Sequence, residues 1–267
     1  MINVSEGRDP ARISAIAEAA GSSLVDLHSD PYHHRSVYTL AGRPDEVEEK
    51  ALSLSLRAVE LLDLRSHQGV HPRLGVVDVV PFVPLGSPPP GEERFARASE
   101  ARARFAGAMA EAGVPCFLYG SERSLPEVRR RAFVDLLPDV GPSEPHPTAG
   151  ACCVGVRDFL VAYNLVIKGP PELAREIARR IRRPELRALG FDLGGESQVS
   201  CNLLSPETLG PGELFDEVSE LAPVVRTELV GLVPRSVLER VAPKRWGALD
   251  LSVGKTIERA LEAKKGS

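Results

Sequence analysis

The segment His67-Gln-Gly-Val-His71-Pro-Arg-Leu-Gly-Val-Val-Asp78-Val-Val-Pro-Phe-Val-Pro84 joins a polar loop to a long apolar run. The nearly continuous apolar sequence of residues 76–84 is typical of a central strand. Its two histidines have the spacing of a metal-binding pair on a helix. Gly69 and Pro72 disfavour a helix there, because the residue before a proline is pushed out of helical geometry. We therefore predict no metal site.

His71 stands immediately before the predicted strand, on a loop from which a side chain can project into a cleft. Imidazole is the side chain best suited to proton transfer near neutral pH. The residues alone leave two interpretations open, a catalytic histidine and a structural histidine that caps the strand.

Outward from this segment, helical and strand patterns alternate with short connections. Residues 9–20 predict a helix, with Asp9 as its N-cap and Pro10 as its first residue. Other segments with helical spacing or turn signals at their ends predict helices at 44–64, 92–112, 171–182 and 212–221, with a helical tail after Pro234. Apolar and β-branched runs predict strands at 24–27, 36–41, 114–119, 152–156, 160–167, 198–204 and 224–229.

The best candidate for a domain boundary is the segment 138–150, which contains four prolines. Proline excludes a regular helix or a central strand there. The segments on either side mix strands and helices in a similar rhythm. We therefore predict two α+β lobes, an N-terminal subdomain at 1–148 and a C-terminal subdomain at 149–267, with the rhythm of a distant duplication.

Composition narrows the class of protein. The net charge is −4 and aromatic residues make up 5%, which argues against nucleic acid as a partner. Cys116, Cys152 and Cys153 are flanked by apolar residues and none of the four cysteines forms a CxxC pair, so we expect buried free thiols in a reducing compartment. The N-terminal residues resemble no leader peptide and no apolar run has the length of a membrane span. We therefore expect a cytoplasmic protein without a membrane partner.

Six collinear motifs identify a family. Residues 67–84 resemble the signature of the formiminotransferase family, which includes the formiminotransferase half of formiminotransferase-cyclodeaminase. Five further motifs have counterparts there in the same order: Asn3-Val-Ser-Glu-Gly7, Arg35-Ser-Val-Tyr-Thr39, Gly141-Pro-Ser143, Gln198-Val-Ser-Cys-Asn-Leu203 and Glu228-Leu-Val-Gly-Leu-Val-Pro234. The resemblance thus spans nearly the whole chain.

The resemblance implies two ferredoxin-like lobes with helices outside and mixed sheets that face each other around a substrate tunnel. It implies transfer of a formimino group from N-formimino-L-glutamate to tetrahydrofolate, in one-carbon metabolism and histidine catabolism. His71 is then the general acid/base, tetrahydrofolate is the co-substrate, no metal is required, and a homodimer is a candidate assembly.

The remaining site residues follow from the motifs. Arg35 and Arg73 are candidates for carboxylate pairing, although a solvated role is open for Arg73. The loop from Gly141 to Gly150 is either a folate-binding wall or a stiff linker. The full set of expected substrate-binding residues is Asn3, Ser5, Glu6, Arg35, Arg73, Gly141, Pro142, Ser143, Gly150, Gln198 and Asn202. Gln198 and Asn202 share one face of a strand, where a polar solvent-facing role is the alternative.

Two features qualify these expectations. His28 stands where the family carries an acidic residue, for which Asp26 or Asp30 are candidate replacements. His28, His33 and His34 allow a metal cluster, but surface histidines are the simpler interpretation. Two alternatives to the transferase therefore stay open: a folate-binding relative without catalysis, and a transferase with another formimino or formyl donor.

Asp78 lies in an apolar strand, so we expect it to pair with an arginine.

Overall fold

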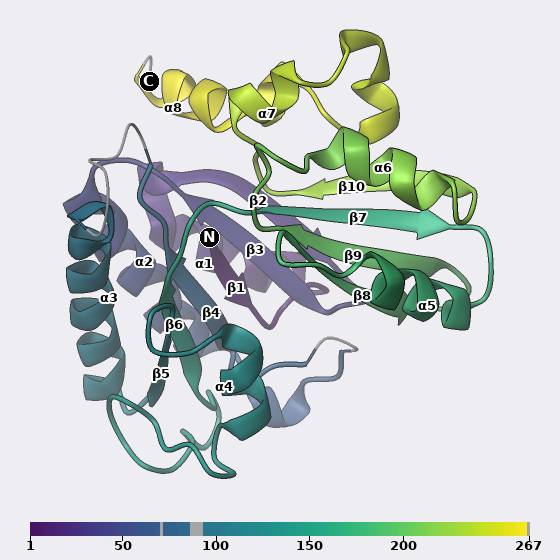
Figure 1. Cartoon of the computed structure of the whole chain (residues 1–267). Helices are drawn as coiled ribbons and strands as arrows, with labels where there is room; N and C mark the ends of the chain where they lie inside the picture. The colour runs from purple at the N-terminus through teal and green to yellow at the C-terminus, as the bar shows by residue number, and fades with distance from the viewer. Residues whose placement is uncertain (70–71, 86–92, 266–267) are drawn as a thin grey trace. The chain divides into compact units, whose positions relative to one another are not determined.

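The computed structural model describes residues 1–69, 72–85 and 93–265. The chain divides into two compact units, Met1–Asp158 and Phe159–Ser267, which Figure 1 colours from purple to teal and from teal to yellow. Each unit combines helices with one sheet, which confirms the predicted pair of α+β lobes.

The first unit is built on a mixed sheet in the order β2-β3-β1-β4-β6-β5. Its strands are β1 (Ile2–Val4), β2 (Leu24–Asp30), β3 (Arg35–Leu40), β4 (Val77–Phe82), β5 (Cys116–Tyr119) and β6 (Cys152–Val156). Its helices are α1 (Pro10–Ala20), α2 (Pro44–Leu61), α3 (Glu93–Glu111) and α4 (Leu125–Arg131), with the short 3-10 turns η1 (Gly21–Ser23) and η2 (Leu64–Ser66).

The first four strands of this sheet have the ferredoxin-like arrangement. The chain order is β1, α1, β2, β3, α2, β4, and β1 pairs antiparallel with both β3 and β4. β6 then joins the outer side of β4 in parallel, and β5 joins β6 in parallel. The ferredoxin-like core is therefore widened by two parallel strands.

Local sequence signals account for the first helix. The Asp9 carboxylate accepts hydrogen bonds from the backbone N–H groups of Ala11 and Arg12, and Pro10 is the first helical residue, as predicted. Ile16 and Ala20 are buried, and they join Ile2 and Val4 of β1 in the core that α1, α2 and α3 cover. α4 packs on the opposite face of the sheet through a separate cluster that includes Val79, Phe117 and Val128.

The second unit contains an antiparallel sheet in the order β10-β7-β9-β8. Its strands are β7 (Val161–Ile167), β8 (Leu186–Asp192), β9 (Ser197–Leu203) and β10 (Val224–Val230). Its helices are α5 (Pro171–Ile181), α6 (Pro211–Ser219), α7 (Arg235–Glu239) and α8 (Ile257–Lys265), with 3-10 turns η3 (Pro243–Arg245), η4 (Gly247–Leu249) and η5 (Val253–Lys255). This sheet is ferredoxin-like in its strand order, but it is antiparallel rather than mixed.

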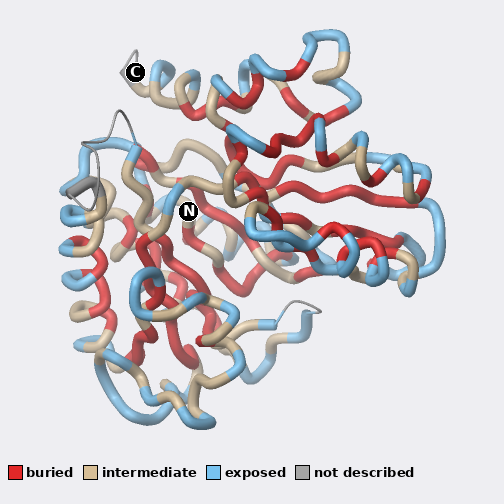
Figure 2. The backbone as a smooth tube through the Cα atoms, viewed as in Figure 1, coloured by how far each residue is buried: buried red, intermediate tan, exposed pale blue. Residues whose placement is uncertain are grey.

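α5 and α6 pack on one face of the second sheet. The buried side chains on that face include Leu165, Val199 and Cys201, and they form one core with the helices. Figure 2 shows buried backbone along the strands of both units. No helix among the described residues is both long and apolar enough to cross a membrane.

The elements absent from the sequence-based expectations include β8 and α4. β8 has weak strand signals, because Arg187, Ala188 and Gly190 favour no strand. α4 does carry a signal, since Ser124 accepts a hydrogen bond from Glu127 N and caps the helix. The units divide after Asp158, beyond the predicted division at 148/149, and β6 pairs within the first sheet.

Candidate active site

The segment after β1 is fastened to β4 and to the start of α1. Ser5 donates through its backbone N to Val76 O and through Oγ to Gly75 O, both at 2.8 Å. The Glu6 side chain is 4% exposed, and its Oε1 accepts from Arg8 N at 2.8 Å and Asp9 N at 3.1 Å. Both residues thus stabilise the segment that follows β1. Asn3 lies within β1, between Val37 of β3 and Val79 of β4.

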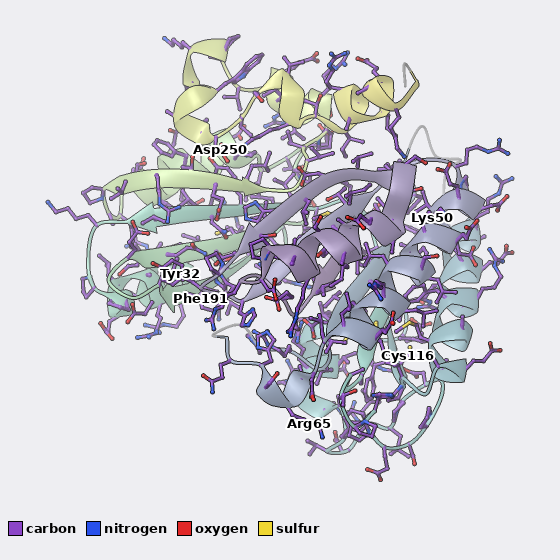
Figure 3. All side chains as sticks on the ribbon, turned by 180° about the vertical axis from the view of Figure 1, so that it is seen from behind. Tyr32, Lys50, Arg65, Cys116, Phe191 and Asp250 are labelled. Carbon is purple, nitrogen blue, oxygen red and sulfur yellow. The ribbon has the colours of Figure 1, made fainter. Side chains whose placement is uncertain are left out.

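The turn between β2 and β3 is rigidly bonded. Asp30 Oδ2 lies 2.5 Å from His33 Nδ1, and Asp30 Oδ1 accepts from Tyr32 N and His33 N. Burial acts to raise the pKa of Asp30, but the hydrogen bonds from His33 and Tyr32 lower that pKa to about 2. Tyr32, labelled in Figure 3, is exposed at the tip of this turn.

Residues on both sides of position 71 are docked on this turn. A Cβ on Gly69 would lie 2.6 Å from the His33 carbonyl oxygen, so the backbone there approaches as closely as glycine permits. Arg73 donates from Nη2 to His33 O at 3.1 Å and from Nη1 to His34 O at 3.3 Å. His71 itself lies outside the described residues, so its position stays a prediction.

His34 and His67 stack beside the Arg73 guanidinium. Their ring centroids are 4.2 Å apart, His67 Nε2 is 3.0 Å from His34 O, and Arg73 Nη1 contacts the His67 ring. Gly7 N donates to His34 Nδ1 at 3.1 Å, which requires that nitrogen to be unprotonated. The neutral form of His34 is therefore favoured, and burial lowers its pKa in agreement.

Several arginines lie close enough to Arg73 for their charges to affect it. Burial lowers the pKa of Arg73, and the charges of Arg35, Arg129 and Arg8 lower it further, while Asp78 opposes them. Arg35 begins β3 opposite Asp30 in register. The guanidinium groups of Arg8, Arg35, Arg73 and Arg129 are thus near enough to interact electrostatically, and such a group of positive charges can attract carboxylate ligands. Two nitrogens of Arg73 are bonded to backbone carbonyls, so part of this guanidinium is engaged within the fold.

Asp78 has the arginine partner that its burial demands. Arg129 from α4 donates from Nη2 to Asp78 Oδ2 at 2.5 Å and from Nη1 to Asp78 Oδ1 at 3.3 Å and Pro72 O at 2.9 Å. Asp78 Oδ1 also accepts from Leu74 N at 2.8 Å. The pair ties α4 to residues 72–74, and it confirms the predicted pairing. Sequence reasoning does not identify Arg129, since nothing in sequence brings α4 to this segment.

The loop from Gly141 to Gly150 has two dissimilar ends. Gly150 is buried and has a φ of +70°, and a Cβ there would lie 2.2 Å from Leu74 O, beside Arg73 in sequence. Gly141, Pro142 and Ser143 are exposed, and the nearest neighbours of Gly141 are Ala110 and Pro115. Only the Gly150 end therefore adjoins the segment that follows position 71.

Gln198 and Asn202 belong to β9 in the second unit. They lie on the same face, opposite the one that α5 and α6 cover, as their spacing predicts. Gln198 is 1% exposed whereas Asn202 is exposed, so the two residues differ in environment.

The histidines at 28, 33 and 34 do not gather into one cluster. Among residues 1–69, 72–85 and 93–265, no group of three or more His, Cys, Asp and Glu side chains has the arrangement of a metal site. His28 pairs in register with Val37 on the face that carries Asn3 and Arg35, while His33 is buried against Asp30. All four cysteines are free and buried, as predicted.

Comparison with known proteins agrees with the fold. A family model described as the formiminotransferase domain, N-terminal subdomain, matches residues 1–157. A glutamate formimidoyltransferase from Streptococcus pyogenes serotype M1 is 33% identical, over 90% of this chain and 90% of its own length. The chain belongs to the formiminotransferase family.

Other family members cover the chain similarly. A glutamate formimidoyltransferase from Thermoplasma acidophilum is 31% identical, over 97% of this chain and 95% of its own length. The formimidoyltransferase-cyclodeaminase of Sus scrofa is 36% identical over 88% of this chain, which matches 50% of the pig protein. The chain thus spans about half the length of the cyclodeaminase relatives, and it is a member of an enzyme family of transferases.

The lowered pKa of His67 is expected to make the stability of the fold depend on pH. Burial and the Arg73 charge lower its pKa from 6.5 to about 4, against a hydrogen bond at the His34 carbonyl. As the pH falls, the unfolded chain therefore binds this proton before the folded chain does. His67 leaves the free energy of unfolding unchanged above pH 6.5 and lowers it as the pH falls toward 4. We expect urea unfolding across this range to show less proton uptake on unfolding in His67→Gln than in wild type. Equal pH dependence in the two proteins would contradict this assignment.

Proposed function

We propose that this chain transfers a formimino group from N-formimino-L-glutamate to the N5 atom of tetrahydrofolate. The observation that carries the proposal is the match to glutamate formimidoyltransferases over nine-tenths or more of both chains. The ferredoxin-like units and the arginines around Arg73 support it.

We assign the proton transfers to His71. N5 of tetrahydrofolate attacks the amidine carbon of the donor and loses its proton to the imidazole. The tetrahedral intermediate then collapses, its bond to the glutamate nitrogen breaks, and the imidazolium returns the proton to that nitrogen. One histidine thus serves as base and then as acid. Holding both substrates in place supplies further acceleration through proximity.

The described residues suggest a division of roles in binding. Arg35 supplies a guanidinium for a substrate carboxylate, with Arg73 adding positive potential while it fastens the turn between β2 and β3. Asn3, Ser5 and Glu6, which lie in β1 and directly after it, contribute to substrate binding. The proposed folate-binding residues are the loop residues Gly141, Pro142, Ser143 and Gly150 in the first unit, and Gln198 and Asn202 in the second.

The remaining requirements follow from the same reaction. Tetrahydrofolate is a co-substrate and the proton transfers need no metal ion. The substrates are small molecules, a homodimer is a candidate assembly, and the buried free thiols suit a cytoplasmic location.

Arg35→Ala tests whether the Arg35 guanidinium binds a substrate carboxylate. We expect a rise of roughly 10-fold or more in the KM of one substrate, because a charge-assisted hydrogen bond is lost. The measurements are steady-state kinetics with each substrate varied and the Kd of 5-formyltetrahydrofolate. Arg57→Ala on α2, where Arg57 pairs with Glu60 at the surface, is the matched control. Unchanged affinities for both folate and donor would remove Arg35 from the site.

A further inference from the structure

The face of the second sheet opposite the one that α5 and α6 cover carries buried polar side chains. The strand registers place Gln198 next to Val166, and Asn164 between Ser200 and Glu228. These residues alternate with Leu165, Val199 and the other core residues that α5 and α6 cover. Phe191 of β8, labelled in Figure 3, is the other neighbour of Gln198 in register.

Burial on this face is confined to part of it. Asn164 is 4% exposed and Gln198 is 1% exposed, whereas Asn202 on the same face of β9 is exposed. Val166, between Gln198 and Arg226 in register, is 2% exposed and provides an apolar surface. A polar solvent-facing role, which the sequence left open for Gln198, is therefore excluded.

Asn164 and Gln198 differ in their hydrogen bonding. Asn164 Nδ2 donates to Glu228 Oε2 at 2.8 Å, which orients the carboxylate on this face. Gln198 Nε2 is buried and has no hydrogen-bond partner among the residues that the structure describes. A buried donor left unsatisfied costs free energy, and such groups are few in native proteins. The Gln198 amide is thus a donor that a bound ligand can satisfy.

We propose that Gln198 and Glu228 recognise the 2-amino-4-oxopyrimidine edge of the pterin ring, an inference that rests on the proposed folate-dependent function. This edge presents N–H donors at the 2-amino group and N3, and an acceptor at O4. A carboxylate accepts from both donors and has capacity for more than the bond from Asn164, while the Gln198 amide donates to O4. Asn164 is the residue that positions Glu228.

The spacing of the strands suits a flat ring. Glu228 on β10 and Gln198 on β9 flank β7, about 10 Å apart across the sheet. The registers also offset them by two residues along β7, or about 7 Å, so the two backbones are about 12 Å apart at these residues. Both side chains are long enough to converge over β7, where Val166 offers an apolar platform to the ring.

A binding cycle between two variants and two ligands tests this inference. The probes are 5-formyltetrahydrofolate and its analogue that lacks the 2-amino group, and calorimetry gives each Kd. We expect Glu228→Gln to weaken binding of 5-formyltetrahydrofolate about 10- to 100-fold, as for a lost hydrogen bond to a charged group. We expect a much smaller effect on the analogue, because the deleted contact is already missing there. Glu172→Gln, exposed on α5 over the other face, is the control.

Gln198→Met separates ligand binding from structure. Met has a similar shape but no donor, so the variant removes an unsatisfied group from the free protein. We expect an equal or higher Tm together with a Kd for 5-formyltetrahydrofolate raised about 5- to 30-fold. A lowered Tm with unchanged affinity, or a Glu228→Gln loss equal for both ligands, would overturn the inference. If the wild-type protein transfers the formimino group and both variants bind 5-formyltetrahydrofolate normally, the pterin inference is wrong and the proposed function stands. If the wild-type protein binds no folate, the proposed function is wrong as well.

Discussion

Replacing His71 with alanine is expected to lower kcat by roughly 10²- to 10⁴-fold, the range for a lost general acid/base. In the proposed reaction one imidazole both removes the N5 proton and protonates the departing nitrogen, so its loss slows both steps. Folate affinity should change little, because Arg35, Gln198 and the other proposed binding residues remain.

The comparison that decides the role of His71 is between turnover and thermal stability. We expect the Tm of His71→Ala to stay close to that of wild type, with kcat measured under saturating substrates. Gln68→Ala, an exposed neighbour in the same segment, is the matched control and should retain turnover. A mutant that loses Tm as clearly as it loses turnover would identify His71 as a structural residue instead.

Replacing Asp78 with alanine is expected to lower the free energy of unfolding by about 3–5 kcal/mol, as for breaking a buried ion pair. Asp78 is 3% exposed, and its removal leaves the Arg129 guanidinium without its carboxylate and Leu74 N without its acceptor. The measurement is urea unfolding at neutral pH.

Asp135→Ala offers the matched comparison for this pair. Asp135 also bonds an arginine of α4, Arg131, but its side chain is 61% exposed. Exposed ion pairs contribute little, so we expect only a small change in unfolding free energy. Equal losses in the two variants would show that burial does not govern the Asp78 pair.

Particular residues show where sequence is sufficient and where it is not. Asp9 and Pro10 specify the start of α1 because capping depends on neighbours in sequence. The apolar run at 76–84 identifies β4, as continuous burial needs continuous apolar residues. β8 escapes prediction, since pairing with β9 rather than local preference makes it a strand.

The site divides in the same way. The sequence indicates that Asp78 needs an arginine, but which arginine depends on where α4 packs. Alternation places Gln198 and Asn202 on one face, but burial of Gln198 alone depends on tertiary structure. The engagement of Arg73 with His33 O and His34 O likewise depends on the approach of two segments that are distant in sequence.

The most direct test is an assay of the wild-type protein with N-formimino-L-glutamate and tetrahydrofolate, following the formimino-folate product by its absorbance and the released glutamate separately. The proposed function predicts that both products form in equal amounts and that neither forms when one substrate is omitted. Absence of turnover, with 5-formyltetrahydrofolate still bound, would contradict it and point to a different donor or to a folate-binding role without catalysis.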